Sequence, residues 1–146
     1  MKKKFLIFIL LLIIGFSVYH IYNTYYKMEK VSEVIDGDTI KLSNNKFVRL
    51  IGINAPEEDE PCYKEAKEKL IKLVKSKTVR LESDIRNKDS YGRLLRYVYV
   101  DDLLVNSEMI RLGYAKVDEF KPNIRYSSLF LEMEDKARRA NRCIWR

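Results

Sequence analysis

The sequence predicts an α+β protein, mainly β: a five-stranded Greek-key barrel of the OB type with three helices, preceded by an N-terminal hydrophobic helix. Three observations predict this architecture: five short apolar runs bounded by turn residues, three stretches with helical periodicity, and an apolar run near the N-terminus. The length of 146 residues suits one domain with an appendage. Barrels of this type often bind oligonucleotides or oligosaccharides on one face, although a fold alone does not establish a function.

The N-terminus begins with lysines and continues into an apolar run, Phe5–Phe16. A helix over Phe5–Tyr22 would be about 27 Å long, which is marginal for a bilayer core of roughly 30 Å. Residues 1–26 are therefore expected to be either a cleaved signal peptide or an uncleaved signal anchor, followed by a short linker at Asn23–Lys27. Tyrosines at positions 19–26 resemble an interfacial aromatic belt and favour the membrane anchor. Either alternative places a domain of residues 28–146 outside the cytoplasm.

The elements of the domain follow from short apolar runs and helical spacing. Five strands are expected at Lys30–Asp36, Asp38–Leu42, Phe47–Ile53, Thr78–Glu82 and Leu94–Val100. Three helices are expected at Cys62–Val74, between a capping Asn106 and a closing Gly113, and at Ser127–Asn141.

Composition limits the chemistry that the domain can perform. The net charge is +7, and Lys2, Lys3 and Lys4 account for three of it, which leaves a mild bias toward polyanions on the rest. The single histidine, His20, lies in the N-terminal apolar stretch, so the globular part has no imidazole. This excludes Ser-His-Asp, Cys-His and histidine-ligated zinc sites there. Acid–base chemistry must use carboxylates, lysines, tyrosines or a metal-bound water.

Oxygen-bearing side chains and one arginine are concentrated in Ile35–Glu57. A hairpin in this segment would bring Asp38 near Asn54 and Glu57, beside Arg49. Such a cluster has the chemistry that a hard cation and a phosphate require. Arg49 lies on a strand without a polar face, so its partner is either a carboxylate of the fold, Asp36 or Asp38, or an anion from outside.

Five sequence blocks occur in order: IDGDT (35–39), VRLIGINAPE (48–57), DSYGRLLRYVYV (89–100), VNSEMIRLGYAKV (105–117) and a closing NRCIW. Together they resemble the staphylococcal nuclease (thermonuclease) family over nearly everything after residue 30. The resemblance implies a five-stranded OB barrel with three helices. It also implies a calcium-dependent phosphodiesterase that cuts DNA and RNA and leaves 3′-phosphates. We expect single strands to be favoured, and no obligate protein partner is implied.

The resemblance assigns roles to particular positions. Asp38 matches a calcium-binding aspartate, Arg49 and Arg93 match two phosphate-clamping arginines, and Glu57 matches the glutamate that orients the attacking water. Behind these, Asp36 matches an acid that supports the calcium ligand.

Other positions complete or alter the family pattern. Tyr91 matches a tyrosine near the bound nucleotide, and Ala55 can supply its backbone carbonyl to the metal. Asn54 stands where the family's best-known member has a second calcium aspartate, so calcium is expected to bind more weakly here. Ser90 replaces a lysine and Phe120 a nucleotide-facing tyrosine, so substrate affinity and base preference are expected to differ.

Cys62 and Cys143 lie far apart and lack the CxxC spacing of a zinc site. Cys62 opens the first helix of the domain, and Cys143 lies close to the C-terminus. An exported location favours a disulfide that ties the tail to that helix, and the alternative is two unrelated buried thiols.

Two functions remain as alternatives at this point. The first is an exported, membrane-tethered nuclease. The second is a non-catalytic nucleic-acid-binding OB module of the same ancestry. The presence of Asp38, Arg49, Glu57 and Arg93 favours the enzyme.

Overall fold

Five strands form a closed barrel of mixed strand direction, as the sequence predicts. In order around the sheet they are β3 (Phe47–Leu50), β2 (Thr39–Leu42), β1 (Tyr26–Val34), β5 (Thr78–Glu82) and β6 (Leu94–Val100), and a parallel pairing of β3 with β6 closes the ring. This computed structural model describes residues 2–146, and the side chains of residues 2 and 20–26 lie outside the description, including most of the predicted tyrosine belt and His20.

Two further pairings extend the barrel. The short strand β7 (Leu103–Leu104) continues the sheet beyond β6, and β4 (Ile53–Asn54) pairs with β8 (Lys116–Val117) in a separate ladder. Side chains at alternate strand positions fill the interior: in β3, Val48 and Leu50 are fully buried, whereas Phe47, the first residue of the strand, is exposed.

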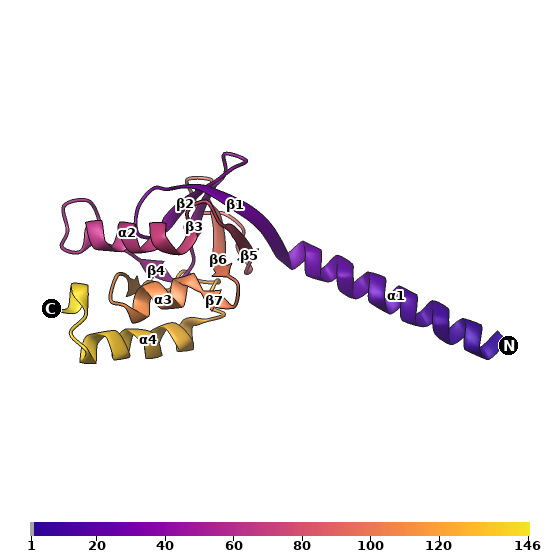
Figure 1. The fold of residues 1–146 in the computed structure, drawn as a ribbon. Helices are drawn as coiled ribbons and strands as arrows, with labels where there is room; N and C mark the ends of the chain where they lie inside the picture. Colours follow the sequence, from indigo (N-terminus) through magenta and orange to yellow (C-terminus); the bar gives the residue numbers. More distant parts are fainter. Residues whose placement is uncertain (1) are drawn as a thin grey trace.

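Three helices follow the first strands, close to their predicted positions: α2 (Tyr63–Val74), α3 (Val105–Arg111) and α4 (Ser127–Arg139). Figure 1 shows them stacked beside the barrel, with α3 between α2 and α4. The buried positions of α2, Ala66, Leu70 and Val74, recur at every fourth residue, which is the spacing that predicted the helix.

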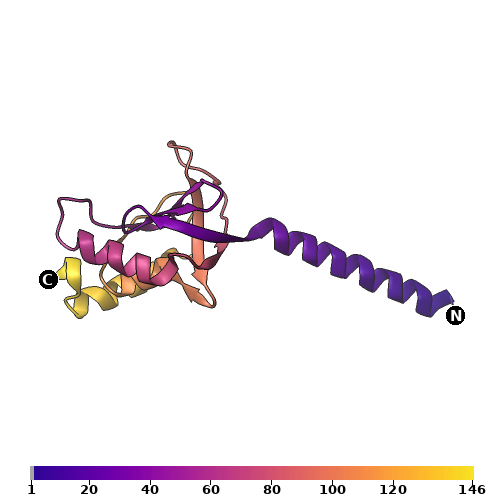
Figure 2. The same cartoon turned by 45° about the horizontal axis from the view of Figure 1, so that its top comes forward.

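A disulfide joins Cys62 to Cys143, with 6.0 Å between their Cα atoms, and confirms the predicted pairing. Cys143 begins a short 3-10 helix, η1 (Cys143–Trp145). In both Figure 1 and Figure 2 the C-terminal turn lies beside the end of α2 from which the chain enters that helix.

Two local predictions within the domain of residues 28–146 are wrong. The third strand ends at Leu50 rather than Ile53, because the chain turns at Gly52, whose φ of +78° favours glycine. A Cβ at Gly52 would also lie 2.7 Å from the ring of Phe130 in α4. Asn106 does not cap α3. Leu104 holds that position, and the Asn106 side chain is fully buried and bound to the backbone of other elements.

The N-terminal stretch forms one helix, α1 (Lys2–Tyr25), which projects away from the barrel and leads directly into β1 without the expected linker (Figure 1). Among the helices of the described residues, none combines the length and the apolar character that a bilayer crossing requires.

Candidate active site

An open pocket on the barrel surface gathers seven residues that the sequence singled out. Its lining consists of Asp36, Asp38, Arg49, Asn54, Glu57, Tyr91 and Arg93. These side chains come from the β1–β2 turn, strands β3 and β4, the loop before α2 and the loop before β6. Ala55 is not part of this lining and instead borders a neighbouring pocket.

The β1–β2 turn holds Asp36 and Asp38 against the β4 segment. The Asp38 backbone N–H donates to Asp36 Oδ1 at 2.9 Å, and Ile35 N–H donates to the Thr39 carbonyl at 2.9 Å. A Cβ at Gly37 would lie 2.5 Å from the Cβ of Ala55, which is closer than side chains can pack. Glycine at this position therefore allows the turn to approach β4.

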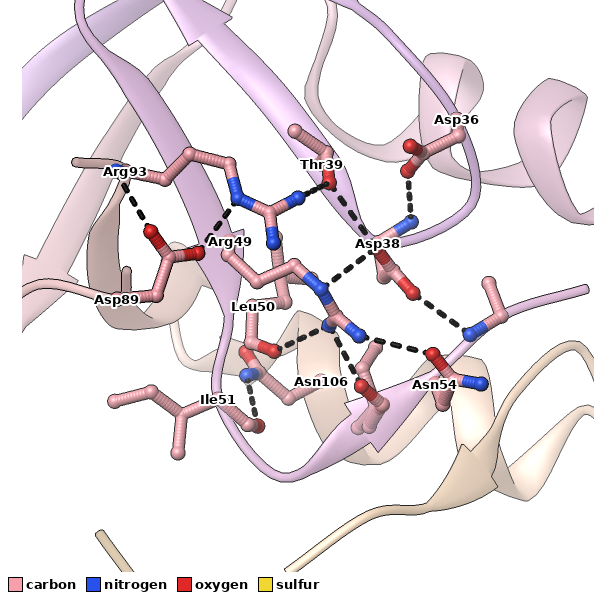
Figure 3. Close-up of polar contacts among 12 residues, drawn as sticks. Asp36, Asp38, Thr39, Arg49, Leu50, Ile51, Asn54, Asp89, Arg93 and Asn106 are labelled. Carbon is pink, nitrogen blue, oxygen red and sulfur yellow. Dashed lines mark hydrogen bonds and ion pairs between the residues drawn. The ribbon is translucent and has the colours of Figure 1, made fainter. Parts of the chain in front are cut away.

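Asp38 is the buried acid of the pocket, with 5% of its surface exposed. Its Oδ2 accepts a hydrogen bond from the Ala55 N–H at 2.7 Å, and its Oδ1 lies 3.1 Å from Arg49 Nε (Figure 3). Burial raises the pKa of Asp38 to about 6, and Asp36 adds to the rise while Arg49 opposes it. The guanidinium thus compensates the buried charge only in part.

Arg49 is held mainly by the fold itself. Its Nη1 donates to the carbonyls of Leu50 at 3.0 Å and Ile53 at 2.6 Å, and its Nη2 donates to Asn54 Oδ1 at 3.0 Å (Figure 3). With the Asp38 ion pair, these contacts involve four of its five N–H groups. The structure therefore resolves the partner of Arg49: it is a carboxylate of the fold, and the guanidinium still lines the pocket.

Arg93 is oriented by the loop that precedes β6. Its Nε donates to Asp89 Oδ2 at 2.7 Å, its Nη1 lies 3.4 Å from Thr39 Oγ1, and its guanidinium lies 5.4 Å from the centroid of the Tyr91 ring. The Arg93 side chain is 29% exposed, against 14% for Arg49, so it is the freer of the two guanidinium groups.

Asp89 shapes the loop as well as Arg93. Its Oδ1 accepts hydrogen bonds from the backbone N–H groups of Tyr91 at 3.0 Å and Arg93 at 2.9 Å. Burial acts to raise the pKa of Asp89, but the hydrogen bonds from Arg93 and the Arg93 charge outweigh it and hold the pKa below its usual value.

The remaining pocket residues face solvent. Glu57 is exposed. Its backbone N–H donates to Glu60 Oε2 at 2.8 Å, and the Glu60 N–H donates to the Glu57 carbonyl at 2.9 Å, so the two residues close a turn. Asn54 is exposed apart from its contact with Arg49, and Tyr91 is 84% exposed. A carboxylate, an amide oxygen and an aromatic ring are thus accessible at the pocket mouth.

Sequence reasoning missed three residues that support the site. Thr39 donates to Asp38 Oδ1 at 3.1 Å and contacts Arg93, and Asp89 orients Arg93. Asn106 donates to the Ile51 carbonyl at 2.8 Å, which fixes the turn before β4 (Figure 3). Its Oδ1 also accepts a hydrogen bond from the Val98 N–H at 2.9 Å. Of the three, only Asp89 could have been recognised from the local sequence. In the segment Asp89–Arg93 an aspartate precedes a glycine by three residues, a pattern typical of a turn that the aspartate side chain stabilises.

The donors in the pocket have the chemistry of a hard-cation site. Among the residues that the structure describes, no three Asp, Glu, His or Cys side chains lie close enough together to form a metal site by themselves. Calcium, however, also accepts amide, carbonyl and water oxygens. The atoms of the pocket that could ligate a metal are all oxygens, and one of its carboxylates, Asp38, is buried with its charge only partly compensated. The residues therefore have the chemistry that calcium binds.

Comparisons with known proteins cover most of the chain. A family model described as staphylococcal nuclease homologue matches residues 47–146. The chain is 33% identical to a thermonuclease of Staphylococcus hyicus over 125 residues, which cover 80% of this chain and 74% of the relative. It is 36% identical to a thermonuclease of Staphylococcus intermedius over 124 residues, covering 79% and 74%. It is also 35% identical to endonuclease YncB of Bacillus subtilis (strain 168) over 126 residues, covering 79% and 60%.

Proposed function

The chain belongs to the staphylococcal nuclease family and is a nuclease, and from this premise we propose that it is a calcium-dependent phosphodiesterase for DNA and RNA. Single strands would be the favoured substrates, and cleavage would leave 3′-phosphates. One observation carries the proposal: two guanidinium groups, three carboxylates and an amide oxygen line a single open pocket.

Arg49 and Arg93 would bind the phosphate that is cleaved. Guanidinium groups match the planar pair of phosphate oxygens and stabilise negative charge that grows on them during the reaction. Arg49 is held by the Leu50 and Ile53 carbonyls, so it would supply a fixed positive charge with one N–H left for the ligand. Arg93 is more exposed and would supply the more adjustable contact.

Glu57 would act as the base. Its exposed carboxylate lines the pocket, so a water between Glu57 and the phosphate could transfer a proton to it while the water oxygen bonds to phosphorus. The bond from phosphorus to the 5′-oxygen would then break, and that oxygen would take up a proton. The phosphate would remain on the 3′ side.

Asp38, Asn54 and the backbone carbonyl of Ala55 would hold calcium. Asp36 would support them, because its Oδ1 accepts the Asp38 N–H and so fixes the turn. When bound, calcium would supply positive charge against the phosphate and lower the pKa of a nearby water. Tyr91, exposed above the Arg93 guanidinium, would pack against the nucleotide.

We further propose that the nuclease domain, residues 28–146, works outside the cytoplasm. The disulfide between Cys62 and Cys143 supports this location, because structural disulfides form and persist in oxidising compartments. Residues 1–26 would then serve in export. Mass spectrometry of the protein from producing cells and from their medium tests this, and a chain found only in reduced form would contradict it.

The direct test is cleavage of denatured DNA by the full chain, with calcium or with a chelator. Wild type should cleave only with calcium, and Glu57→Gln should lower the rate by about a hundredfold or more, the range expected for loss of a general base. Glu58→Gln is the matched control, because this neighbouring acid is exposed and does not line the pocket. Binding of DNA without cleavage under any condition would instead favour a nucleic-acid-binding module.

A further inference from the structure

A basic groove lies beside the active-site pocket, and we propose that it binds single-stranded nucleic acid beyond the cleaved phosphate. This inference rests on the proposed function, since it extends the substrate path of the same site. The groove is lined by Asn45, Lys46, Phe47, Lys88, Gly92 and Leu94.

The position of the groove follows from the closure of the barrel. The parallel pairing of β3 with β6 sets Val48 opposite Leu94, so the turn before β3 and the loop before β6 lie together. The backbones of Lys88 and Leu94 pair in an isolated antiparallel β-bridge at the base of that loop. Gly92 belongs to the same loop as Tyr91 and Arg93, which line the active-site pocket. One loop therefore separates the pocket from the groove, and a nucleic-acid strand at Arg93 reaches the groove by passing it.

The charge of the groove is positive and is not neutralised from within. Lys46 and Lys88 are exposed, no acid is among the lining residues, and no salt bridge joins either lysine to another residue of the described chain. Lys41 adds a third cation at the edge, with its Nζ 5.7 Å from the centroid of the Phe47 ring. The nearest acid in the loop, Asp89, is engaged by Arg93. Phosphates of a polynucleotide complement such a surface and release bound counterions when they occupy it.

Phe47 indicates that the occupant is single-stranded. Its side chain is 43% exposed at the groove, although its neighbour Val48 is fully buried in the barrel. An exposed aromatic ring flanked by cations provides a stacking surface for an unpaired base. The bases of a duplex are already stacked within the helix and are not available to the ring. Phe47 therefore adds affinity for a single strand that a duplex cannot gain.

The test measures how tightly the full chain binds two probes when a chelator is present to prevent calcium-dependent cleavage. The probes are a single-stranded oligothymidylate of about twelve nucleotides and a thymidine dinucleotide. Lys46→Ala/Lys88→Ala should weaken oligonucleotide binding about tenfold and reduce the slope of log K against log salt by about 1.4, the value for two contacts to single-stranded phosphates. Dinucleotide binding should not change. Lys64→Ala/Lys75→Ala removes the same charge from exposed positions of the α2 region and serves as the matched control.

Phe47→Ala should weaken oligonucleotide binding by about fivefold or more and leave the affinity for a DNA hairpin duplex unchanged. The proposal is overturned if the groove variants bind the oligonucleotide as the control does, or if Phe47→Ala weakens duplex and single strand equally. Calcium-dependent cleavage of the dinucleotide is measured in parallel. Its absence in wild type refutes the proposed function, whereas normal cleavage with unchanged oligonucleotide binding refutes the groove alone.

Discussion

Replacing both Cys62 and Cys143 by alanine should lower the free energy of unfolding by about 4.5 kcal/mol. The bridge closes a loop with a sequence separation of 81 residues. In the chain-entropy model, closing such a loop removes about 15 cal/mol/K from the unfolded chain, which gives the stated energy at room temperature. For a protein of this size the loss corresponds to a fall of about 9 to 18 °C in the midpoint of thermal unfolding.

The native state should keep its geometry without the bridge, because other contacts hold the tail. The Ile144 N–H donates to the Gly113 carbonyl at 3.2 Å, and the Trp145 ring lies 4.1 Å from the Arg138 guanidinium. Arg138 belongs to α4, which is anchored in the core by Phe130. The effect of the double variant should therefore arise mainly in the unfolded state, as the entropic estimate assumes.

Urea unfolding followed by two signals measures this effect. The single tryptophan, Trp145, reports on the tail by fluorescence, and far-UV circular dichroism reports on the whole domain. The slope of the unfolding free energy against urea concentration should be steeper in the double variant, because its unfolded chain is less compact. Wild type with the disulfide reduced should show the same steeper slope as the double variant. A loss below about 1 kcal/mol would refute the entropic reasoning. A fluorescence transition at lower urea than the dichroism transition would show instead that the tail undocks by itself.

Three further substitutions test the site. Asn54→Asp should tighten calcium binding by about 1–2 kcal/mol because a charged ligand replaces a neutral one, and a calorimetric titration without any gain would contradict this. Asp89→Asn should lower kcat/KM about tenfold or more, since Arg93 loses a charge-assisted hydrogen bond worth about 1.5–3 kcal/mol, and unchanged steady-state kinetics would argue against that role. Gly37→Ala should destabilise the fold by about 1–3 kcal/mol through the 2.5 Å approach to Ala55, and coincident urea curves for variant and wild type would disprove the clash.

The parts of the fold with strong local periodicity could be predicted from the sequence. The spacing of Ala66, Leu70 and Val74 identified α2, and short apolar runs identified the barrel strands. The pairing of Ile53 with Val117 could not be predicted, because strands of two residues carry no periodicity and join segments far apart in the chain. Asn106 was misassigned for a related reason: local rules favour a cap, whereas its hydrogen bonds reach other elements.

The features that the sequence did not reveal are the ones that assemble the site. Asp38 is held by the Ala55 N–H, and Arg49 by the Ile53 carbonyl, so both depend on the position of the short strand β4. That strand is fixed by a residue far along the chain, since Asn106 of the 105–117 block binds the Ile51 carbonyl just before it. The motif residues thus line the pocket, while contacts distant in sequence set its geometry. For this reason a chain could keep Asp38, Arg49 and Arg93 and still lose the pocket, if the turn before β4 were displaced.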